Sequence, residues 1–212
     1  MRGMQKPQAL VAGLILAAGA GSRYGMPKAL VHDESGESWL RHAVDVLRAA
    51  GCSPVIVVLG AHGAEAAVVL DPALNKNSVP VVVVQAPDWS EGLSASLRAG
   101  LKRATEEAGP VAVAVIPVDV PDLNAATVLR VIGSSRADTG GPAVASADTL
   151  RQARFSGRPG HPVVLGRAHW EPLIHTLAGD TGAQPYLRTH DVESIECGDL
   201  GTGLDVDRPT SG

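Results

Sequence analysis

The segment 14–28 limits the fold more than any other part of the chain, because it joins an apolar run to a glycine-containing turn and two cations. It reads Leu-Ile-Leu-Ala-Ala-Gly-Ala-Gly-Ser-Arg-Tyr-Gly-Met-Pro-Lys. Glycine has no Cβ, so a turn of this kind lets backbone N–H groups approach a bound anion closely. Arg23 and Lys28 add positive charge that suits phosphates. The segment therefore predicts a strand that ends in a cradle for a triphosphate.

Two common phosphate-binding motifs do not fit this segment. The P-loop needs a lysine directly after glycine and before Ser or Thr, whereas Lys28 follows a proline. The dinucleotide fingerprint Gly-x-Gly-x-x-Gly has Gly19 and Gly21 in place, but Tyr24 occupies its third position. It also needs an acidic residue about 20 residues further on, and the predicted second strand ends in Leu-Gly-Ala at residues 59–61. Both motifs are therefore disfavoured.

The amino-terminal residues have the outline of an export signal. Arg2 and Lys6 precede an apolar run over residues 10–18 that ends in small residues. Cleavage there would remove the strand that carries the cradle. The run is also short and interrupted by glycine, so we expect a loose leader over residues 1–9 instead.

The composition predicts a single α/β domain that spans residues 1–212. With 212 residues and 45% hydrophobic content, the chain can bury a substantial core. Only 3% of the residues are aromatic, so this core must consist of Val, Leu, Ile and Ala, as in parallel sheets.

Charge and cysteine content limit the partners and the compartment. The formal net charge of −4 argues against nonspecific binding to nucleic acid or to an anionic membrane surface. No apolar run reaches the length of a membrane span. Cys52 and Cys197 lie far apart and form no Cys-x-x-Cys pair, so neither a disulfide framework nor a zinc site is predicted. The expected location is a reducing cytoplasm.

Hydrophobic spacing predicts strands that alternate with helices. The strands are expected over residues 10–16, 55–59, 79–84, 111–116, 162–165 and 192–197. The helices are expected over residues 38–50, 64–70, 124–132, 168–177 and 183–189. One more helix is expected to begin within residues 85–100 and to end near residue 108. Residues 134–160 are rich in Gly, Ser, Ala and Arg and are interpreted as an excursion. This alternation predicts a mostly parallel sheet covered on both faces, with the 79–84 strand near its centre.

Three loops follow predicted strands: residues 17–28, 85–96 and 117–122. In open parallel sheets, ligands bind at the carboxyl ends of the strands. Gly92 and Ser94 open a helix whose free N–H groups suit a phosphate or a base edge. Ser94 and Ser96 fit ordinary helix capping equally well. The three loops therefore predict one binding site at this edge of the sheet.

Aspartates in two places suit a divalent cation. Asp119 follows a buried strand, where its carboxylate would face the phosphate cradle and hold Mg²⁺; the alternative is a plain turn residue. Asp205 and Asp207 would point the same way in an extended segment and supply a second ligand, unless the terminus is frayed. We expect Asp122 to help start the next helix.

Two turns offer further polar side chains. A turn over residues 157–162 presents Arg158 and His161, and another over residues 179–184 contains Asp180 and leads into a helix. The other histidines show no spacing typical of metal ligands, so we expect most of them at the surface. Trp89 and Trp170 are interpreted as packing groups.

Together these segments resemble the MobA-like nucleotidyltransferases, specifically the molybdenum cofactor cytidylyltransferase branch. The similar segments are residues 16–19 with Arg23, Gly25 and Lys28, then residues 92–100, 119–121, 157–163 and 205–209. The guanylyl branch usually begins its loop Leu-Ala-Gly-Gly and has Asp before the lysine. This chain has Ala-Ala-Gly at residues 17–19 and Pro27 before Lys28, which favours CTP.

The resemblance implies a Rossmann-like three-layer fold of the nucleotide-diphospho-sugar transferase type. It implies Mg²⁺ and transfer of CMP from CTP to the phosphate of molybdopterin or molybdenum cofactor, and it admits a molybdoenzyme or its chaperone as a protein partner. Catalytic roles fall on Arg23, Lys28 and Asp119. The metal ligands would be Asp119, Asp207 and Asp205, and the acceptor contacts Arg158, His161 and Asp180. The implied nucleotide contacts are Leu16, Ala17, Ala18, Gly19, Gly21, Ser22, Arg23, Lys28, Gln85, Gly92, Ser94, Ser96 and Asp119.

Four alternatives stay open at this point. Gln184 stands where the family often has arginine, and Thr210-Ser211 replaces an acidic continuation. A guanylyltransferase and a sugar-1-phosphate nucleotidyltransferase would use the same cradle. An NAD(P)H-dependent oxidoreductase of the nicotine-blue type shares the sequence pattern, although the dinucleotide fingerprint is missing. A nucleotide-binding regulator without turnover is the non-enzymatic alternative.

Overall fold

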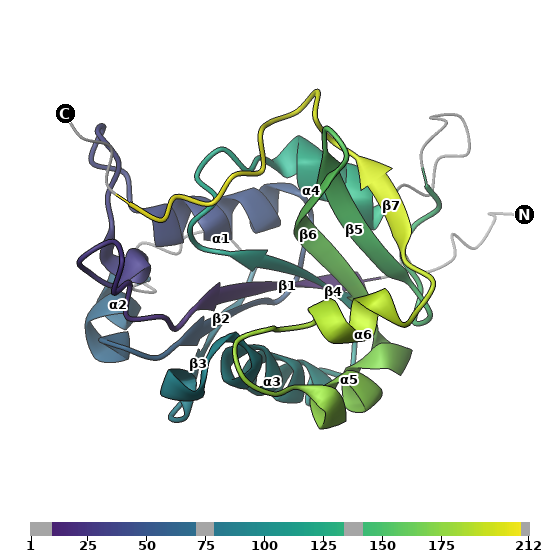
Figure 1. Cartoon of the computed structure of the whole chain (residues 1–212), viewed down its shortest axis with the longest axis horizontal. Coiled ribbons are helices and arrows are strands. Elements are labelled where there is room, and N and C mark those ends of the chain that lie inside the picture. The colour runs from purple at the N-terminus through teal and green to yellow at the C-terminus, as the bar shows by residue number, and fades with distance from the viewer. Residues whose placement is uncertain (1–9, 71–78, 134–141, 209–212) are drawn as a thin grey trace, which may run out of the picture.

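The computed structural model describes residues 10–70, 79–133 and 142–208, and Figure 1 shows their arrangement. Within these residues the strands are β1 (Leu10–Ala17), β2 (Val55–Leu59), β3 (Val81–Gln85), β4 (Pro110–Pro117), β5 (Leu150–Phe155), β6 (Arg158–Gly166) and β7 (Glu193–Glu196). The α-helices are α1 (Trp39–Ala49), α2 (Gly63–Val69), α3 (Leu93–Thr105), α4 (Ala125–Ile132), α5 (Trp170–Thr176) and α6 (Gln184–Arg188). The leader expected over residues 1–9 lies outside the described residues.

The described strands form one seven-stranded sheet in the order β3-β2-β1-β4-β6-β5-β7. β3, β2, β1 and β4 are parallel neighbours, and β5 and β7 are also parallel to each other. Only β6 runs antiparallel to its neighbours β4 and β5. The expectation of a mostly parallel sheet is confirmed.

Helices cover both faces of the sheet, which gives the expected three layers (Figure 1). α1 and α4 pack on one face, and α3, α5 and α6 pack on the other. Side chains along β1 alternate between the two layers: Ile15 belongs to the α1 side and Leu14 to the α3 side. The core is therefore built from aliphatic residues on both sides of a buried central strand, as the composition predicts.

Glycine allows the helices to approach β1 closely. A Cβ at Gly13 would lie 2.6 Å from Leu47 Cδ1 of α1, and a Cβ at Gly100 of α3 would lie 2.5 Å from Leu14 Cδ1. Both distances are far shorter than a van der Waals contact, so a side chain at either position would push a helix away from the sheet.

Two predictions about the sheet are wrong. The 79–84 strand is an edge strand rather than a central one: β3 pairs only with β2 among the described strands, and Val83 is 40% exposed. A run of valines has the same pattern in an edge strand as in a central one, because periodicity reports burial on two faces and not the number of neighbouring strands. The 134–160 excursion also contains a regular strand, β5, which pairs with β6 and β7.

The helix boundaries agree closely with the sequence prediction. Ser38 and Asn124 cap α1 and α4, since their side-chain oxygens accept hydrogen bonds from the N–H groups of Arg41 and Thr127. Cys52 and Cys197 are both free and buried. No helix among the described residues is long and apolar enough to span a membrane.

Candidate active site

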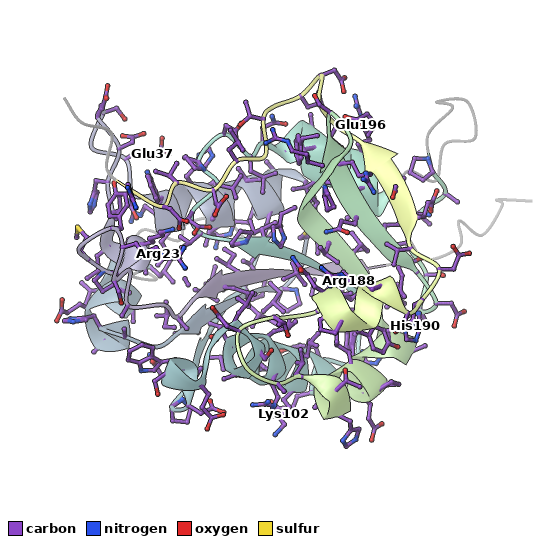
Figure 2. The ribbon with its side chains drawn as sticks, in the orientation of Figure 1. Arg23, Glu37, Lys102, Arg188, His190 and Glu196 are labelled. Carbon is purple, nitrogen blue, oxygen red and sulfur yellow. The ribbon has the colours of Figure 1, made fainter. Side chains whose placement is uncertain are left out.

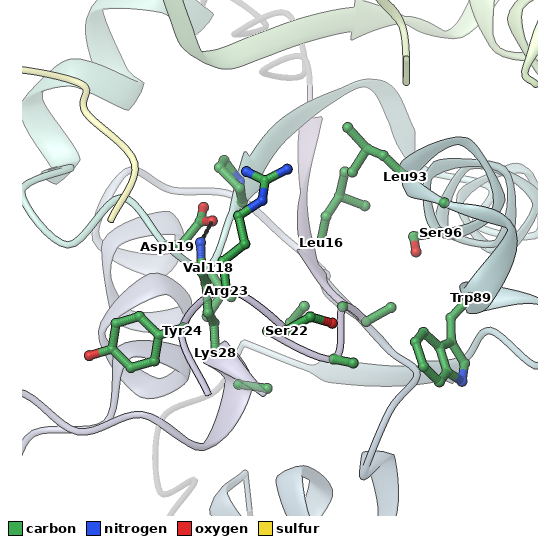
Figure 3. Close-up of a pocket in the computed structure, with 18 of the residues that line it drawn as sticks. Leu16, Ser22, Arg23, Tyr24, Lys28, Trp89, Leu93, Ser96, Val118 and Asp119 are labelled. Atoms are coloured by element: carbon green, nitrogen blue, oxygen red, sulfur yellow. Dashed lines mark hydrogen bonds and ion pairs between the residues drawn. The ribbon is translucent and has the colours of Figure 1, made fainter. Parts of the chain in front are cut away.

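A cavity of about 440 Å³ lies at the carboxyl ends of β1 and β4 (Figure 3). Arg23, Lys28 and Asp119 lie toward one wall, whereas Trp89, Leu93 and Ser96 lie across from them. The lining residues are Leu16, Ala17, Ala18, Gly19, Ala20, Gly21, Ser22, Arg23, Tyr24, Lys28, Ala29, Trp89, Ser90, Gly92, Leu93, Ser96, Pro117, Val118, Asp119, Asp180 and Asp207. Residues from all three of the predicted loops therefore line the cavity. It lies at the edge of the sheet where the sequence predicts a binding site.

The segment after β1 folds back on itself to bring both cations to the cavity. Gly21 has a φ of +63°, and its carbonyl accepts hydrogen bonds from the N–H groups of Tyr24 (2.9 Å) and Gly25 (2.8 Å). A side chain at Gly21 would collide with the carbonyl of Met26. Beside Gly19, by contrast, the space that a Cβ would enter is open. The backbone at Gly19 is therefore accessible to an anion, as the cradle hypothesis requires.

Lys28 joins two carboxylates that lie far apart in the sequence. Its Nζ donates to Asp119 Oδ2 at 2.7 Å and to Asp207 Oδ1 at 3.0 Å. Arg23 donates to the other oxygen of Asp207, Oδ2, at 3.0 Å. The Lys28 side chain is 13% exposed and that of Arg23 is 73% exposed, so Lys28 is the anchored cation and Arg23 the one freer to move.

Electrostatics keep both partners of this contact charged. Burial acts to lower the pKa of Lys28, but hydrogen bonds and charge interactions with Asp119 and Asp207 outweigh it, so the pKa lies above its ordinary value. The hydrogen bond from Lys28 lowers the pKa of Asp207 below its ordinary value. The pair therefore consists of an ammonium and a carboxylate at neutral pH.

Asp119, Asp205 and Asp207 form a cluster that fits a divalent cation. One oxygen from each carboxylate lies within 4.8 Å of the others. Magnesium and manganese prefer oxygen ligands, and a site with a few carboxylates leaves room for phosphate oxygens as well. The residues present therefore fit the implied metal.

The segment that carries Asp205 and Asp207 is held by groups of the loop that follows β4. We call residues 199–208 the C-terminal strap; it contains no helix or strand. Asp122 Oδ2 accepts hydrogen bonds from the N–H and the hydroxyl of Thr202, both at 2.6 Å. The N–H of Val206 donates to the Asp119 carbonyl at 2.9 Å. The terminus is thus docked at these residues rather than frayed.

Asp122 does not start α4, contrary to the sequence prediction. Asn124 caps that helix, and the Asp122 carboxylate faces the strap instead. The prediction failed because an aspartate shortly before a helix often contributes to its start, whereas the hydrogen-bond partner of Asp122 lies 80 residues away in the sequence. Only the Asp-x-Asp pattern near the terminus signalled that this segment reaches the site.

Asp180 and Ser94 fix the start of α3 beside the cavity. Asp180 Oδ1 accepts a hydrogen bond from the Leu93 N–H at 2.9 Å, so it satisfies one free donor of the helix. Ser94 is buried, donates to the Ala178 carbonyl at 3.0 Å and accepts from the Gly182 N–H at 3.2 Å. Ser94 therefore does not line the cavity, whereas Gly92 and Ser96 do.

Four other predicted site residues lie outside the cavity lining, although one of them, Asp205, belongs to the acidic cluster. Gln85 is exposed at the end of β3, and its amide packs against Gly63. The turn expected over residues 157–162 is wrong: Ser156 and Gly157 make the turn, and Arg158 and His161 belong to β6. The pattern misled because a Gly- and Pro-rich segment usually marks a turn, but here its backbone pairs with β5.

His161 nevertheless lies within electrostatic range of the acidic cluster. Its Nδ1 is 3.3 Å from the Val115 carbonyl. Burial lowers the pKa of His161 below its ordinary value, whereas that hydrogen bond and the charges of Asp119 and Asp205 act in the opposite direction. Arg158 is exposed near the β5–β6 turn.

Comparison with known proteins shows two relatives with different names. A nicotine blue oxidoreductase from Paenarthrobacter nicotinovorans is 36% identical over 200 residues, which are 93% of this chain and 92% of that protein. A probable molybdenum cofactor guanylyltransferase from Rhodopirellula baltica is 32% identical over 124 residues, or 58% of this chain and 55% of that protein.

A solved structure has the same fold over nearly the whole chain. Rv0371c of Mycobacterium tuberculosis H37Rv, solved as a complex with manganese, has a TM-score of 0.66 and 26% sequence identity, and the match covers 93% of this chain and 94% of that one. Residues 13–194 match the MobA-like NTP transferase domain family. The chain therefore belongs to the MobA-like NTP transferase domain family.

Proposed function

We propose that the chain is a metal-dependent nucleotidyltransferase that moves CMP from CTP to the phosphate of molybdopterin or molybdenum cofactor and releases pyrophosphate. One observation carries the proposal: Lys28 and Arg23 meet Asp119 and Asp207 at the wall of a cavity of about 440 Å³. Such a site offers cations to a triphosphate and carboxylates to a divalent cation.

Different observations support different parts of the proposal. Family membership supports nucleotidyl transfer. The relative named as a molybdenum cofactor guanylyltransferase supports the acceptor, and the manganese complex of Rv0371c supports a divalent cation, for which we propose Mg²⁺. The choice of CTP over GTP rests on residues 17–19 and on Pro27.

The reaction needs positioning and charge neutralisation rather than a covalent enzyme intermediate. An oxygen of the acceptor phosphate attacks the α-phosphorus of CTP, the bond to the bridging oxygen breaks, and pyrophosphate leaves with the electron pair. Arg23 and Lys28 would neutralise the charge that grows on pyrophosphate. The divalent cation, when bound at Asp119, Asp205 and Asp207, would screen the repulsion between the two phosphates. Lys28 must exchange a carboxylate partner for a phosphate as CTP enters.

The remaining contacts are proposed from the residues that line the cavity. The open backbone at Gly19, together with Gly21 and Ser22, is proposed for the phosphates. Gly92 and Ser96, at the start of α3, are proposed for the nucleoside, and Ser96 lies across the cavity from Lys28 (Figure 3). Of the proposed acceptor contacts, Asp180 lines the cavity and His161 lies near the acidic cluster.

The test is pyrophosphate release from each NTP in turn, with Mg²⁺ and with molybdopterin or its molybdenum-containing form as acceptor. CTP-selective release supports the proposal, and GTP-selective release would make the chain a guanylyltransferase. Release only with a sugar 1-phosphate would change the acceptor. Nucleotide binding without release with any acceptor would favour a regulator.

A second candidate is an NAD(P)H-dependent oxidoreductase of the nicotine-blue type. The 36% identity to the protein of that name, over 93% of this chain, favours it. Oxidation of NADH or NADPH with a quinonoid dye, by a preparation that releases no pyrophosphate from any NTP, would establish this candidate and contradict nucleotidyl transfer.

A further inference from the structure

The C-terminal strap needs an external anchor to bring its carboxylates to the site. In Figure 1 the strap is the yellow segment that runs from β7 across to the loop after β1. Residues 201–208 have no regular secondary structure, so no helix or sheet ladder fixes their path. The positions of Asp205 and Asp207 therefore depend on a few hydrogen bonds to other parts of the chain.

Those hydrogen bonds occur at intervals along the strap. Arg130 pairs with Asp199 at its beginning, and Asn124 Nδ2 donates to the Leu200 carbonyl at 2.7 Å. Asp122 then accepts both hydrogen bonds from Thr202. Asp122 is the last of these side-chain anchors before the two ligand aspartates. It thus controls the direction in which the strap enters the site.

The contact between Asp122 and Thr202 fixes the strap backbone more firmly than a single hydrogen bond would. One oxygen, Oδ2, accepts from the backbone N–H and from the hydroxyl of the same residue, both at 2.6 Å. A carboxylate acceptor makes both bonds stronger than neutral ones. Gly201 fits against it, since a Cβ there would lie only 3.3 Å from the same oxygen. The strap backbone is therefore clamped at one defined point.

The clamp and the first ligand lie in the same short loop. Asp119 and Asp122 both follow β4, and the Asp119 carbonyl also accepts the hydrogen bond of the Val206 N–H. A shift of this loop would move one ligand and the support of the other two together. When a group that orients metal ligands without touching the metal is substituted, the affinity for the metal falls strongly.

We propose that Asp122 is a positioning residue whose clamp on Thr202 places Asp205 and Asp207 beside Asp119 as ligands of one divalent cation. This inference rests on the metal-binding part of the proposed function and not on the identity of the nucleotide or the acceptor. Asp122 itself contacts neither the cation nor the substrate.

The experiment measures Mn²⁺ affinity of the full chain by electron paramagnetic resonance, without any nucleotide. Asp122→Ala removes the clamp, and Thr202→Val removes one of its two donors without a change in charge. Thr202→Ser keeps both donors and is the conservative control. Asp191→Ala removes the same charge as Asp122→Ala from an exposed position in the turn before β7.

We expect Asp122→Ala to weaken Mn²⁺ binding about 10- to 100-fold. Thr202→Val should weaken it by a smaller factor, while Thr202→Ser and Asp191→Ala should bind as the unaltered chain does. Amide hydrogen exchange in residues 199–208 should rise in Asp122→Ala and in Thr202→Val but not in the two controls, which reports the release of the strap directly.

Two results would overturn the inference. The first is unchanged Mn²⁺ affinity in Asp122→Ala although exchange in the strap has risen. The second is weaker binding in Asp122→Ala and Asp191→Ala alike, with Thr202→Val unaffected, since loss of charge alone would then explain it. Failure of nucleotidyl transfer would leave both readouts intact, so the inference and the proposed function fail separately.

Discussion

Arg23, Lys28 and Asp119 reach the cavity from the loops that follow β1 and β4, whereas Asp207 reaches it from the C-terminal strap, where Asp205 completes the acidic cluster. The first group lies in loops that follow two neighbouring parallel strands, and these strands are buried on both faces. The second stands on a segment without regular structure, held by Asp122 and by contacts with Asp119, Arg23 and Lys28. The strand-end half is thus fixed by the fold, and the strap half by a few polar contacts.

Because of this difference, substitutions in the strap should affect function more than they affect the stability of the fold. Changes in the strap should alter metal binding with little cost to the free energy of unfolding, because few apolar side chains are buried there. Substitutions at the strand ends affect residues that contact both halves of the site. Lys28 and Asp119 are the points where the halves meet, so substitutions there should have the largest effects.

Asp119→Ala should have the largest effect of all. It removes a metal ligand and the partner of Lys28 at once, so turnover should fall by more than about 10³-fold, which corresponds to several kcal/mol of lost transition-state stabilisation. The fold should survive, since Asp119 lies at the end of β4 rather than in the core. Pyrophosphate release and circular dichroism on the same preparation test this. Turnover within tenfold of the unaltered chain would contradict the role of Asp119.

Lys28→Ala should lower turnover about 10²- to 10³-fold, because a cation that neutralises charge in the transition state is lost. It should also increase the rise in melting temperature that Mn²⁺ causes. Without the ammonium, the carboxylates of Asp119 and Asp207 repel each other until a cation binds.

Thermal melts with and without Mn²⁺ measure this second effect. Lys102→Ala, on the exposed side of α3 away from the strap (Figure 2), is the matched control. A metal-dependent shift in Lys28→Ala that is no larger than in Lys102→Ala would show that Lys28 does not hold the carboxylates in the metal-free protein.

Asp205→Asn and Asp207→Asn should distinguish a pure metal ligand from one that also pairs with cations. Both should weaken Mn²⁺ binding about 10- to 100-fold, in the range seen when the surroundings of a metal are altered. Only Asp207→Asn should change the metal-free protein, because Asp207 pairs with Arg23 and Lys28. Calorimetric titration and metal-free thermal melts measure the two effects. Equal behaviour of the two variants in the metal-free melts would contradict the assignment.

Gly203→Ala should have the smallest effect, a loss of a few-fold in Mn²⁺ affinity. Gly203 has a φ of +62°, and a side chain there would collide with the Phe155 ring beneath the strap. Gly157→Ala is the matched control, because Gly157 has a φ of +80° but open space beside it. Both variants bear backbone strain of about 1 kcal/mol or more. If Gly157→Ala weakens Mn²⁺ binding as much, displacement of the strap is not the cause.

The strand-end half could be predicted from the sequence, because its signals are local. The bounds of β2 agree with the prediction, and Gly19, Arg23 and Lys28 line the cavity after β1, where the sequence predicts a phosphate cradle. Asp119 was identified because it directly follows a buried strand. In a parallel sheet, knowing where strands end is nearly sufficient to know where a ligand binds.

For the strap half, the sequence predicts which residues could bind a metal but not how the strap is held in place. Asp205 and Asp207 were identified as alternating carboxylates, but their support by Asp122 depends on pairing between residues distant in the sequence. The same limit explains the missed strand β5 and the edge position of β3, since strand order follows from long-range packing. Short-range spacing carries no information about either.

The most direct test of the account is a crystal structure of the full chain with CTP and Mn²⁺, in which anomalous scattering locates the metal. The account predicts a Mn²⁺ peak at about 2.0–2.4 Å from oxygens of Asp119, Asp205 and Asp207, with Lys28 moved from Asp207 to a phosphate of CTP. A peak away from these carboxylates, or a Lys28 that still bridges Asp119 and Asp207 with CTP bound, would contradict the claim that the two halves form one nucleotidyl-transfer site.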